Sequence, residues 1–356
     1  MKIVFFIGSM QRGGAERVIS ILANEYASKG WDVEIALLLE DAVAYTLDER
    51  IHVVSLVGKS GSYLKNALFW LRGIRRYLKQ TKPDRVVSFI GRINALVLTA
   101  ALGLKVPVVV SERNDPKHDG RGRGMQAYCN LIYKSADAIV FQNQYEKSCF
   151  SRSLDKIGYV IPNPVSVQAV HEGKAFNRTV ATAGRLVSQK NHAMLIDAVG
   201  AVRGEYPDVR CEIYGDGSLY DTLQTQIETS GLAETVSLKG NVSDVHQRLK
   251  DCGLFVMTSE FEGLSNALIE AMMMGLPCIT TDYPGVSELI RDGENGLIVP
   301  CGDVNGLVKA MERLLRDEDG IRQRIAEQAQ KDAEQFKADR VLALWHNVIL
   351  KEGKNE

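Results

Sequence analysis

Short runs of apolar and β-branched residues alternate with helical patterns along nearly all of the 356 residues. Runs of this kind are typical of strands buried in a parallel sheet, and their alternation with helices indicates βαβ units. The alternation stops once, at Pro162-Asn163-Pro164, where two prolines in three residues exclude a helix. We therefore expect two α/β domains with parallel sheets, and a boundary near residues 164–176.

Each series contains six expected strands. The first has Ile3–Ile7, Val33–Leu39, Ile51–Leu56, Arg85–Phe89, Val106–Val110 and Ala138–Phe141; the second has Arg178–Ala183, Arg210–Tyr214, Val236–Leu238, Gly253–Thr258, Cys278–Thr281 and Gly296–Val299. The last helical pattern, Arg340–Leu350, has an apolar stripe that needs a partner surface. Two Rossmann-like halves joined by one linker leave a cleft between them, and ligands bind outside the carboxyl ends of the strands.

Composition excludes several classes of protein. Hydrophobic residues make up 45% and charged residues 24%, which is typical of globular proteins and excludes wholesale disorder. The chain contains no run of about 18 uncharged apolar residues, the length that spans a bilayer. The apolar start of the chain indicates a buried strand rather than a signal peptide. The six cysteines are scattered without a C-x-x-C pair, so neither a disulfide framework nor a zinc site is expected. A cytoplasmic protein is the resulting expectation.

Positive charge is concentrated in the first half of the chain. Residues 1–170 have a net charge of +8 and the remainder −9, and the run Lys59–Lys82 contains seven basic residues and no acidic one. Apolar and aromatic residues are interleaved with these charges, as in a helix at a membrane interface. The expected membrane contacts are Lys65, Trp70, Arg72, Arg75 and Arg76. The alternative is a helix packed on the sheet with a basic outer face; no nucleic-acid partner is expected, because no recognised binding module accompanies the run.

One motif follows the first strand of each series, and both motifs indicate a phosphate-bearing ligand. Gly13-Gly14-Ala15-Glu16-Arg17 opens the first helix, although the dinucleotide pattern G-x-G-x-x-G is absent. In the second series, Arg185 and Lys190 lie five residues apart in the loop before a helix capped by Asn191. Two cations beside a helix N-terminus would neutralise a diphosphate.

The stretch from Ser259 to Gly275 is the most informative in the chain. A strand ends in the acidic turn around Glu262, and Glu270 lies in the following helix among apolar residues. A buried carboxylate needs partners, and the vicinal hydroxyls of a ribose would suit Glu270 because a carboxylate accepts two donors. Glu262 would then face the reacting group, and backbone N–H groups of residues 263–265 would face phosphate.

Three further strand ends are weaker candidates. The turns at Gly215 and at Asn241 could frame a base through backbone groups, although plain turns have the same composition. Polar residues also follow the strand Val106–Val110, at the edge of the sheet where ligands bind. Arg113 and Asn114 are expected there to bind the second substrate, which would accept the transferred group.

Together these motifs resemble the retaining glycosyltransferases of family 4. The resemblance rests on Gly13-Gly14-Ala15-Glu16-Arg17, Pro162-Asn163-Pro164, Gly184-Arg185 with Lys190-Asn191, and Glu262-x7-Glu270 followed by Ala271-Met272, which occur in the expected order across essentially the whole chain. It implies a GT-B architecture, with an acceptor-binding domain of residues 1–164 plus a returning helix, 338–356, and a nucleotide-sugar-binding domain of residues 165–337.

The resemblance also implies roles for individual residues. Arg185, Lys190 and Glu262 would be catalytic, with the two cations on the diphosphate and Glu262 on the donor sugar. The donor-binding residues expected on this basis are Gly14, Arg185, Lys190, Gly215, Asn241, Glu262, Gly263, Leu264, Ser265, Asn266 and Glu270. Family members need no metal, so no cofactor is expected. Many relatives have a histidine in the first-domain loop. The comparable stretch of this chain, residues 112–115, has no histidine, and His118 lies further along. The acceptor-side catalytic residue therefore stays unassigned.

The expected function is therefore retaining transfer of a hexose or N-acetylhexosamine from a UDP-sugar to a saccharide acceptor. The basic run favours an acceptor on polyprenyl diphosphate and peripheral contact with the anionic inner face of the cell membrane, in glycan or polysaccharide biosynthesis. Two other functions stay open, a UDP-sugar 2-epimerase that needs no acceptor and a non-catalytic nucleotide-sugar-binding module. The sequence does not identify the donor sugar, the exact acceptor, the linkage or the oligomeric state.

Overall fold

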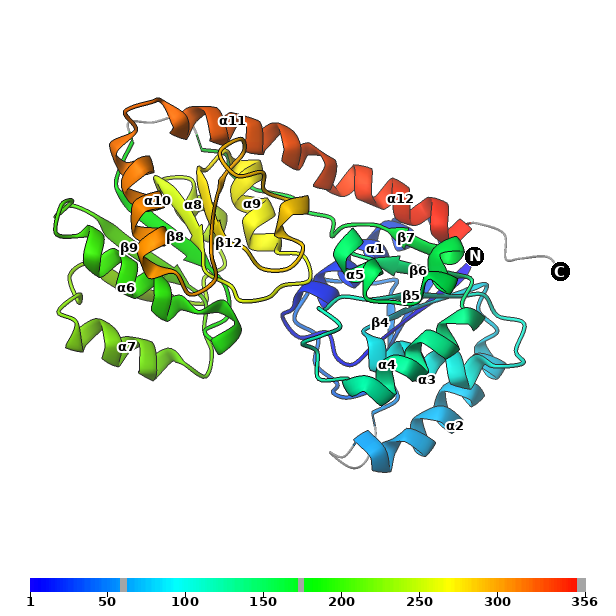
Figure 1. The fold of residues 1–356 in the computed structure, drawn as a ribbon. Coiled ribbons are helices and arrows are strands. Elements are labelled where there is room, and N and C mark those ends of the chain that lie inside the picture. The colour runs from blue at the N-terminus through cyan, green and yellow to red at the C-terminus, as the bar shows by residue number, and fades with distance from the viewer. Residues whose placement is uncertain (58–62, 172–175, 351–356) are drawn as a thin grey trace. The chain divides into compact units, whose positions relative to one another are not determined.

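A computed structural model of the chain describes residues 1–57, 63–171 and 176–350. The chain divides into two compact units (Figure 1). The first unit consists of Met1–Pro164 together with the segment that begins at Ala338, and the second unit consists of Val165–Lys337. Each unit contains one parallel sheet covered by helices, which confirms the predicted fold class of two Rossmann-like domains.

The first unit contains a seven-stranded sheet in the order β3-β2-β1-β4-β5-β6-β7, and its pairings among the described residues are parallel. Its strands are β1 Lys2–Ile7, β2 Asp32–Leu37, β3 His52–Ser55, β4 Arg85–Phe89, β5 Val108–Ser111, β6 Ala138–Phe141 and β7 Gly158–Val160. Its helices are α1 Gly14–Ser28, α2 Tyr63–Thr81, α3 Gly91–Ala101, α4 Gly122–Ile132, α5 Gln144–Ser148 and α12 Ala338–Leu350. The short strand β7 was not expected from the sequence, and neither were α3 and α4.

Alternate residues of the first sheet enter two separate cores, because successive side chains of a strand point to opposite faces. Val4 and Phe6 of β1 pack with residues of α2, α3 and α4. Ile3 and Phe5 pack on the other face with α1 and α12, where Trp345 is fully buried. The apolar stripe of the C-terminal helix therefore covers the first unit, as the resemblance implies.

The second unit contains a six-stranded parallel sheet in the order β10-β9-β8-β11-β12-β13. Its strands are β8 Thr179–Ala183, β9 Arg210–Tyr214, β10 Val236–Gly240, β11 Leu254–Met257, β12 Cys278–Thr281 and β13 Leu297–Val299. Its helices are α6 His192–Val202, α7 Tyr220–Thr229, α8 Val245–Leu249, α9 Asn266–Met274, α10 Val304–Arg316 and α11 Ile321–Ala333. Helices α6, α7 and α10 pack on one face, α8 and α9 pack on the other, and α11 contributes to both cores.

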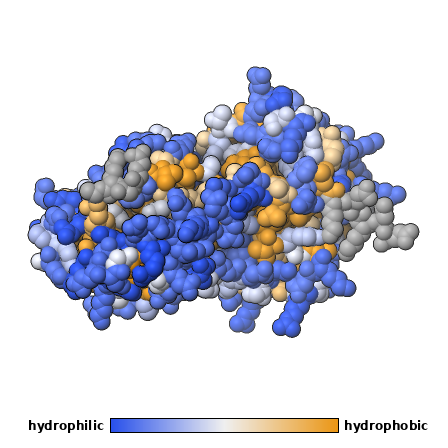
Figure 2. Space-filling model, turned by 90° about the horizontal axis from the view of Figure 1, so that it is seen from above, coloured by the Kyte–Doolittle hydropathy of each residue, from blue (hydrophilic) through white to orange (hydrophobic). Residues whose placement is uncertain are grey.

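Hydrophilic side chains cover most of the face drawn in Figure 2, with hydrophobic ones scattered in groups between them. Within the described residues, no helix combines the length and the apolar character that crossing a bilayer requires. The strand order places β8 and β11 side by side at the centre of the second sheet. The loops that follow these two strands contain Lys190 and Glu262, so the topology brings the two strongest sequence motifs to one edge.

Candidate active site

Two loops at the carboxyl edge of the second sheet are tied together by hydrogen bonds. The loop between β8 and α6 contributes the backbone carbonyls of Lys190 and Asn191, which accept from the Thr258 hydroxyl at 3.0 and 2.9 Å. Glu260 N–H donates to the Gln189 carbonyl at 2.9 Å, and the Gln189 side chain donates to the Phe261 carbonyl at 2.7 Å. These bonds fix the backbone that leads into Glu262.

Lys190 and Glu262 form an ion pair between the two loops. The Lys190 and Glu262 side chains are 15% and 9% exposed, so the pair is largely buried but still open to one side. Arg185 lies in the same loop as Lys190 and is exposed. The second unit thus presents two cations and a carboxylate at the edge where ligands of such sheets bind.

Glycines allow the neighbouring loops to approach one another closely. Gly215 follows β9 with a φ of +137°, and a Cβ built on it would lie 1.9 Å from the Gly184 carbonyl oxygen. Its N–H donates to the Gly240 carbonyl at 2.9 Å, which joins the turns after β9 and β10. A side chain at Gly215 would therefore push the loop of Arg185 out of place. Asn241, the next residue after β10, is exposed at this edge.

The segment from Gly263 to Asn266 forms the turn into α9. The Ser265 hydroxyl accepts from Leu268 N–H at 3.3 Å and caps the helix, while Leu264 is buried in the core of this unit. Gly263 and Asn266 are half-buried. The Ser265 side chain is committed to the cap, so contact between this turn and a ligand would be made by its backbone or by Asn266.

Glu270 lies one turn into α9 and is buried, as the sequence predicts. Its Oε2 lies 3.3 Å from Nε2 of His246, which belongs to the first turn of α8. Tyr283 follows β12 with a buried hydroxyl that has no hydrogen-bond partner among the described residues. Burial raises the pKa of Tyr283 well above its usual value, and the charge of Glu262 adds to this effect. Neither His246 nor Tyr283 was singled out from the sequence.

His192 begins α6 directly behind this edge and is buried. Its Nε2 lies 3.2 Å from the Arg185 carbonyl oxygen. Burial lowers the pKa of His192 to about 4, so the imidazole is neutral at pH 7. The residue supports the loop of Arg185 rather than exchanging protons with a ligand.

In the first unit, Gly14 is the exposed first residue of α1. The preceding turn is held by Tyr45, whose hydroxyl donates to the Gly13 carbonyl at 2.8 Å and accepts from Gly13 N–H at 3.1 Å. Asn114 is exposed in the loop after β5. Both positions are reachable from solvent, and their roles in ligand binding stay predictions.

Arg113 does not occupy the position expected for an acceptor-binding residue. Its guanidinium carbon lies 5.1 Å from the Phe89 ring and 5.2 Å from the Trp345 ring, and Nη1 donates to Asn163 Oδ1 at 2.6 Å. The residue is buried under α12, and this burial lowers the pKa of its guanidinium to about 10. The prediction of direct acceptor contact by Arg113 is therefore wrong, because a helix more than 200 residues away in the chain covers it.

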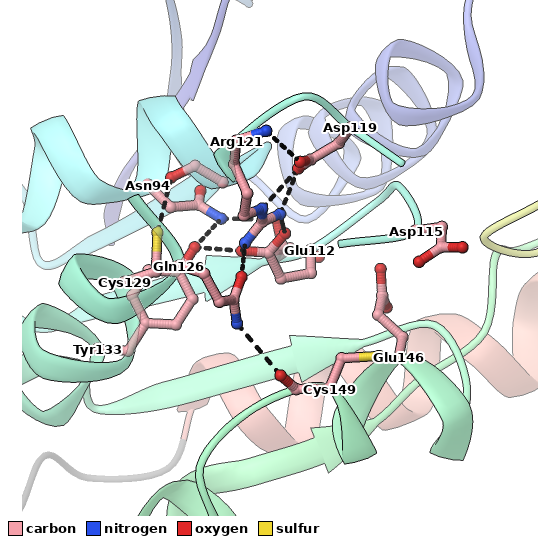
Figure 3. Close-up of polar contacts among 12 residues, drawn as sticks. Asn94, Glu112, Asp115, Asp119, Arg121, Gln126, Cys129, Tyr133, Glu146 and Cys149 are labelled. Atoms are coloured by element: carbon pink, nitrogen blue, oxygen red, sulfur yellow. Dashed lines mark hydrogen bonds and ion pairs between the residues drawn. The ribbon is translucent and has the colours of Figure 1, made fainter. Parts of the chain in front are cut away.

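A buried ion pair fixes the loop between β5 and α4 (Figure 3). Arg121 donates to Glu112 at 2.6 Å and to Asp119 at 2.7 Å, and the Tyr133 hydroxyl donates to the other oxygen of Glu112. The side chains of Arg121 and Glu112 are only 2% and 1% exposed. This network holds the loop in place but leaves Glu112 closed to a ligand.

Asp115 lies apart from that network in Figure 3, and its side chain contacts His118. Its Oδ2 lies 2.6 Å from Nδ1 of His118, and the Tyr145 hydroxyl donates to Oδ1 at 3.3 Å. Asp115 is buried, whereas the His118 side chain is 44% exposed. A buried carboxylate at Nδ1 orients an imidazole and fixes its tautomer, so this exposed loop contains a positioned histidine that the sequence motif did not single out.

Comparisons with known proteins agree with this geometry. The family model described as Glycosyl transferases group 1 matches residues 168–332, and the model described as Glycosyltransferase Family 4 matches residues 12–169. The two matches overlap at residues 168–169 and leave only the ends of the chain uncovered. The chain is a GT-B glycosyltransferase.

Similar proteins include two glycosyltransferases of Campylobacter jejuni. The enzyme named GalNAc-α-(1→4)-GalNAc-α-(1→3)-diNAcBac-PP-undecaprenol α-1,4-N-acetyl-D-galactosaminyltransferase is 26% identical to this glycosyltransferase over 98% of both chains. The N-acetylgalactosamine-N,N'-diacetylbacillosaminyl-diphospho-undecaprenol 4-α-N-acetylgalactosaminyltransferase is 27% identical over 94% of this chain and 95% of its own. Among solved structures, Anabaena HepE in complex with UDP superposes with a TM-score of 0.84 at 21% identity, covering 98% of this chain and 99% of HepE. That likeness supports the fold.

Helix α2 of the glycosyltransferase differs in part from the predicted membrane contact. Trp70 is only 2% exposed and packs in the core beneath the helix, so the prediction of lipid contact is wrong for this residue. Arg75 is half-buried and donates to the Ala100 and Leu102 carbonyls, both at 2.8 Å, and thereby caps the end of α3. Six other described residues of α2 are exposed, namely Leu68, Phe69, Arg72, Arg76, Lys79 and Gln80. Lys59 and the side chain of Lys65 lie outside the described residues.

Proposed function

We propose that this glycosyltransferase transfers a hexose or N-acetylhexosamine from a UDP-sugar, with retention of configuration, to a saccharide on polyprenyl diphosphate at the inner face of the cell membrane. Enzymes with similar sequences are named for the transfer of N-acetylgalactosamine to undecaprenyl-diphosphate-linked saccharides. A fold neighbour has been solved with UDP. These names support a UDP-sugar donor and a lipid-linked acceptor for this chain.

The observation that supports the proposal most is the open ion pair of Lys190 and Glu262. A largely buried carboxylate and ammonium at the carboxyl edge of a Rossmann-like sheet cost desolvation energy, so such a pair is a weak source of stability. Here the pair stays partly exposed, and the exposed Arg185 lies in the same loop. A nucleoside diphosphate bound at this edge would meet both cations.

The chemistry follows from the charges of the donor. When the bond between the sugar and the diphosphate breaks, negative charge grows on the phosphate oxygens and positive charge grows on the sugar ring. Arg185, Lys190 and the N-terminus of α9 would stabilise the phosphate charge, and Glu262 would hold the donor sugar through its hydroxyls. For retention, the acceptor hydroxyl would attack from the face that the diphosphate leaves, and a phosphate oxygen would take its proton. No side chain needs to form a covalent intermediate.

A panel of UDP-sugars tests this proposal. UDP release is measured for each donor, with and without a short saccharide on polyprenyl diphosphate, for wild type, Glu262→Gln and the control Glu260→Gln. Glu260 is an exposed carboxylate two residues away, so its change alters the same charge outside the ion pair. We expect acceptor-dependent release with one donor that is lost in Glu262→Gln and kept in Glu260→Gln.

Other results would select one of the rival functions. Conversion of the donor without any acceptor indicates a 2-epimerase. Binding of UDP without turnover of any donor indicates a nucleotide-sugar-binding module. The anomeric configuration of the product, read by NMR, separates retention from inversion.

The exposed residues of α2 support contact with an anionic membrane. Leu68 and Phe69 are 65% and 46% exposed, and Arg72 and Arg76 lie one and two turns further along the helix. Apolar side chains beside arginines can enter the interface while the cations contact lipid phosphates. Because each basic residue near an anionic surface contributes about 1 kcal/mol, we expect Arg72→Gln with Arg76→Gln to weaken binding to phosphatidylglycerol vesicles by roughly 30-fold.

A charge-matched variant in the second unit serves as the control for this measurement. Lys309→Gln with Arg324→Gln removes two exposed basic residues from α10 and α11 and should leave vesicle binding near the wild-type value. If both double variants bind vesicles as wild type does, the membrane role of α2 is wrong, whereas the transferase proposal is unaffected.

A further inference from the structure

Tyr283 lies in the loop that follows β12, beside the turn that contains Glu262. Strands β11 and β12 pair in parallel, so the loops that follow them leave the sheet at the same carboxyl edge. The Thr281 hydroxyl donates to the Ser259 carbonyl and ties these two loops together. Tyr283 also packs in the same buried cluster as Leu264, two residues beyond Glu262. The fold therefore places this tyrosine next to the candidate active site.

The hydroxyl of Tyr283 is a buried hydrogen-bond donor without an acceptor. The residue is 2% exposed, and its hydroxyl has no hydrogen-bond partner within residues 1–57, 63–171 and 176–350. Burial raises the pKa of Tyr283 well above its usual value and the charge of Glu262 raises it further, so the proton stays on the oxygen. An unpaired buried hydroxyl destabilises the free protein relative to phenylalanine, and such groups need an explanation.

Glu262 is a carboxylate that can accept from this hydroxyl. In the free protein its Oε1 pairs with Lys190, and its Oε2 lies 3.5 Å from the Gln189 side-chain nitrogen, at the limit of a hydrogen bond. A carboxylate accepts up to about four hydrogen bonds. In the proposed function Lys190 also contacts the diphosphate, and an ammonium that turns toward phosphate leaves Glu262 without its main partner. A protonated hydroxyl beside Glu262 can take that place.

We propose that Tyr283 is a positioning residue for Glu262, whose carboxylate accepts from the Tyr283 hydroxyl once Lys190 engages the diphosphate of the UDP-sugar. This inference rests on the proposed UDP-sugar substrate. The exchange of partners keeps Glu262 hydrogen-bonded and oriented while the ammonium contacts the phosphates. It also explains why a hydroxyl that stabilises nothing in the free protein is present at this position.

Tyr283→Phe tests the exchange, because it removes one oxygen and keeps the ring. Tyr206→Phe is the matched control. Tyr206 is another buried tyrosine of the second unit, and it precedes β9 at the amino edge of the sheet, where its hydroxyl lies 3.4 Å from Nε of Arg316. Both changes are made in wild type, in Glu262→Ala and in Lys190→Ala. Calorimetry measures the dissociation constant for UDP, and thermal unfolding measures the midpoint without ligand.

We expect Tyr283→Phe to weaken UDP binding by about tenfold, because the complex loses a hydrogen bond to a charged group. The unfolding midpoint without ligand should equal or exceed that of wild type. In the Glu262→Ala background the same change should alter the dissociation constant by less than about twofold, because the acceptor is already absent.

The Lys190→Ala background should show the opposite effect on stability. Glu262 there has no ammonium partner even without ligand, so the Tyr283 hydroxyl should already donate to it. Tyr283→Phe should therefore lower the unfolding midpoint in this background, although it does not do so in wild type. Tyr206→Phe should leave UDP binding unchanged in every background.

Three results would overturn the inference and leave the proposed function standing. The first is a Tyr283→Phe variant that binds UDP as wild type does. The second is a Tyr283→Phe variant of the wild-type chain that unfolds at a clearly lower temperature without ligand, because the hydroxyl then has a partner in the free protein. The third is an equal loss of UDP affinity in the Glu262→Ala background. Wild type that binds no UDP would instead refute the proposed substrate, and the inference with it.

Discussion

The two units each contain a buried carboxylate paired with a cation after a strand of a parallel sheet, but the two pairs differ in access. In the first unit, Glu112 and Arg121 are almost completely sealed, and Tyr133 and Asp119 saturate their remaining polar atoms. In the second unit, Lys190 and Glu262 retain a side open to solvent. The same chemistry therefore stabilises a loop in one unit and leaves charge available to a ligand in the other.

Breaking the sealed pair should have the largest effect on stability. Glu112→Ala leaves Arg121 buried without its main counter-charge and removes the acceptor of the Tyr133 hydroxyl. Losing one partner of a buried pair typically costs about 3–5 kcal/mol, so we expect the first unit to unfold at a clearly lower temperature. Scanning calorimetry measures this change. A Glu112→Ala variant as stable as wild type would show that the pair does not hold the loop.

The next largest loss of stability is expected at acid pH, and it should affect the second unit. The pKa of His192 falls from 6.5 to about 4 on folding, so the unfolded chain binds a proton in this range that the folded unit does not. The stability that this difference provides is full above pH 6.5 and is lost as the pH falls to about 4, by about 3 kcal/mol in all. Unfolding by urea from pH 7 to 4 measures the slope. His192→Gln should flatten it, and an unchanged slope in that variant would contradict the assignment.

Removing the cation of the open pair should affect catalysis more than folding. Lys190→Ala leaves Glu262 without its partner, but water can reach the carboxylate, so we expect only a small loss of stability. Transfer should fall by about 10²-fold, because a preorganised positive charge near the leaving group is lost. Initial rates and the unfolding midpoint, measured on the same preparation, test both parts. Loss of stability as large as in Glu112→Ala would remove the distinction between the two pairs.

The smallest effect is expected from metal removal. Within the described residues, no group of three or more His, Cys, Asp or Glu side chains is arranged to hold a metal ion. Arg185 and Lys190 would supply the positive charge at the diphosphate in the proposed reaction. Treatment with EDTA should leave the transfer rate within about twofold of the untreated rate. Removal of a metal cation that stabilises the leaving phosphate would lower the rate much more than this. A complete loss that Mg²⁺ or Mn²⁺ restores would contradict this expectation.

The sequence predicted what depends on local pattern and missed what depends on distant contacts. The alternation of apolar runs and helical patterns predicted both sheets, and the Pro162-Asn163-Pro164 break gave the linker. The predicted membrane contact of Trp70 conflicts with its spacing, because Ile74 and Leu78 follow it at intervals of four and mark the buried stripe of α2. That error could have been avoided from the sequence.

The burial of Arg113 and the neighbours of Glu270 could not be predicted in the same way. Arg113 is covered by Trp345 of α12, and no residue near it in the sequence signals this contact. His246 meets Glu270 across 24 positions of the chain, through two helices that follow different strands. Such pairs are set by packing between helices, so only the structure brings them together.

The most direct test of the difference between the two pairs is to measure kcat and the free energy of unfolding together in Glu262→Gln. Our account predicts that kcat falls by at least about 100-fold while the free energy of unfolding stays within about 1 kcal/mol of wild type. The opposite result, a variant destabilised by several kcal/mol whose folded fraction transfers sugar at the wild-type rate, would show that the Lys190–Glu262 pair is structural.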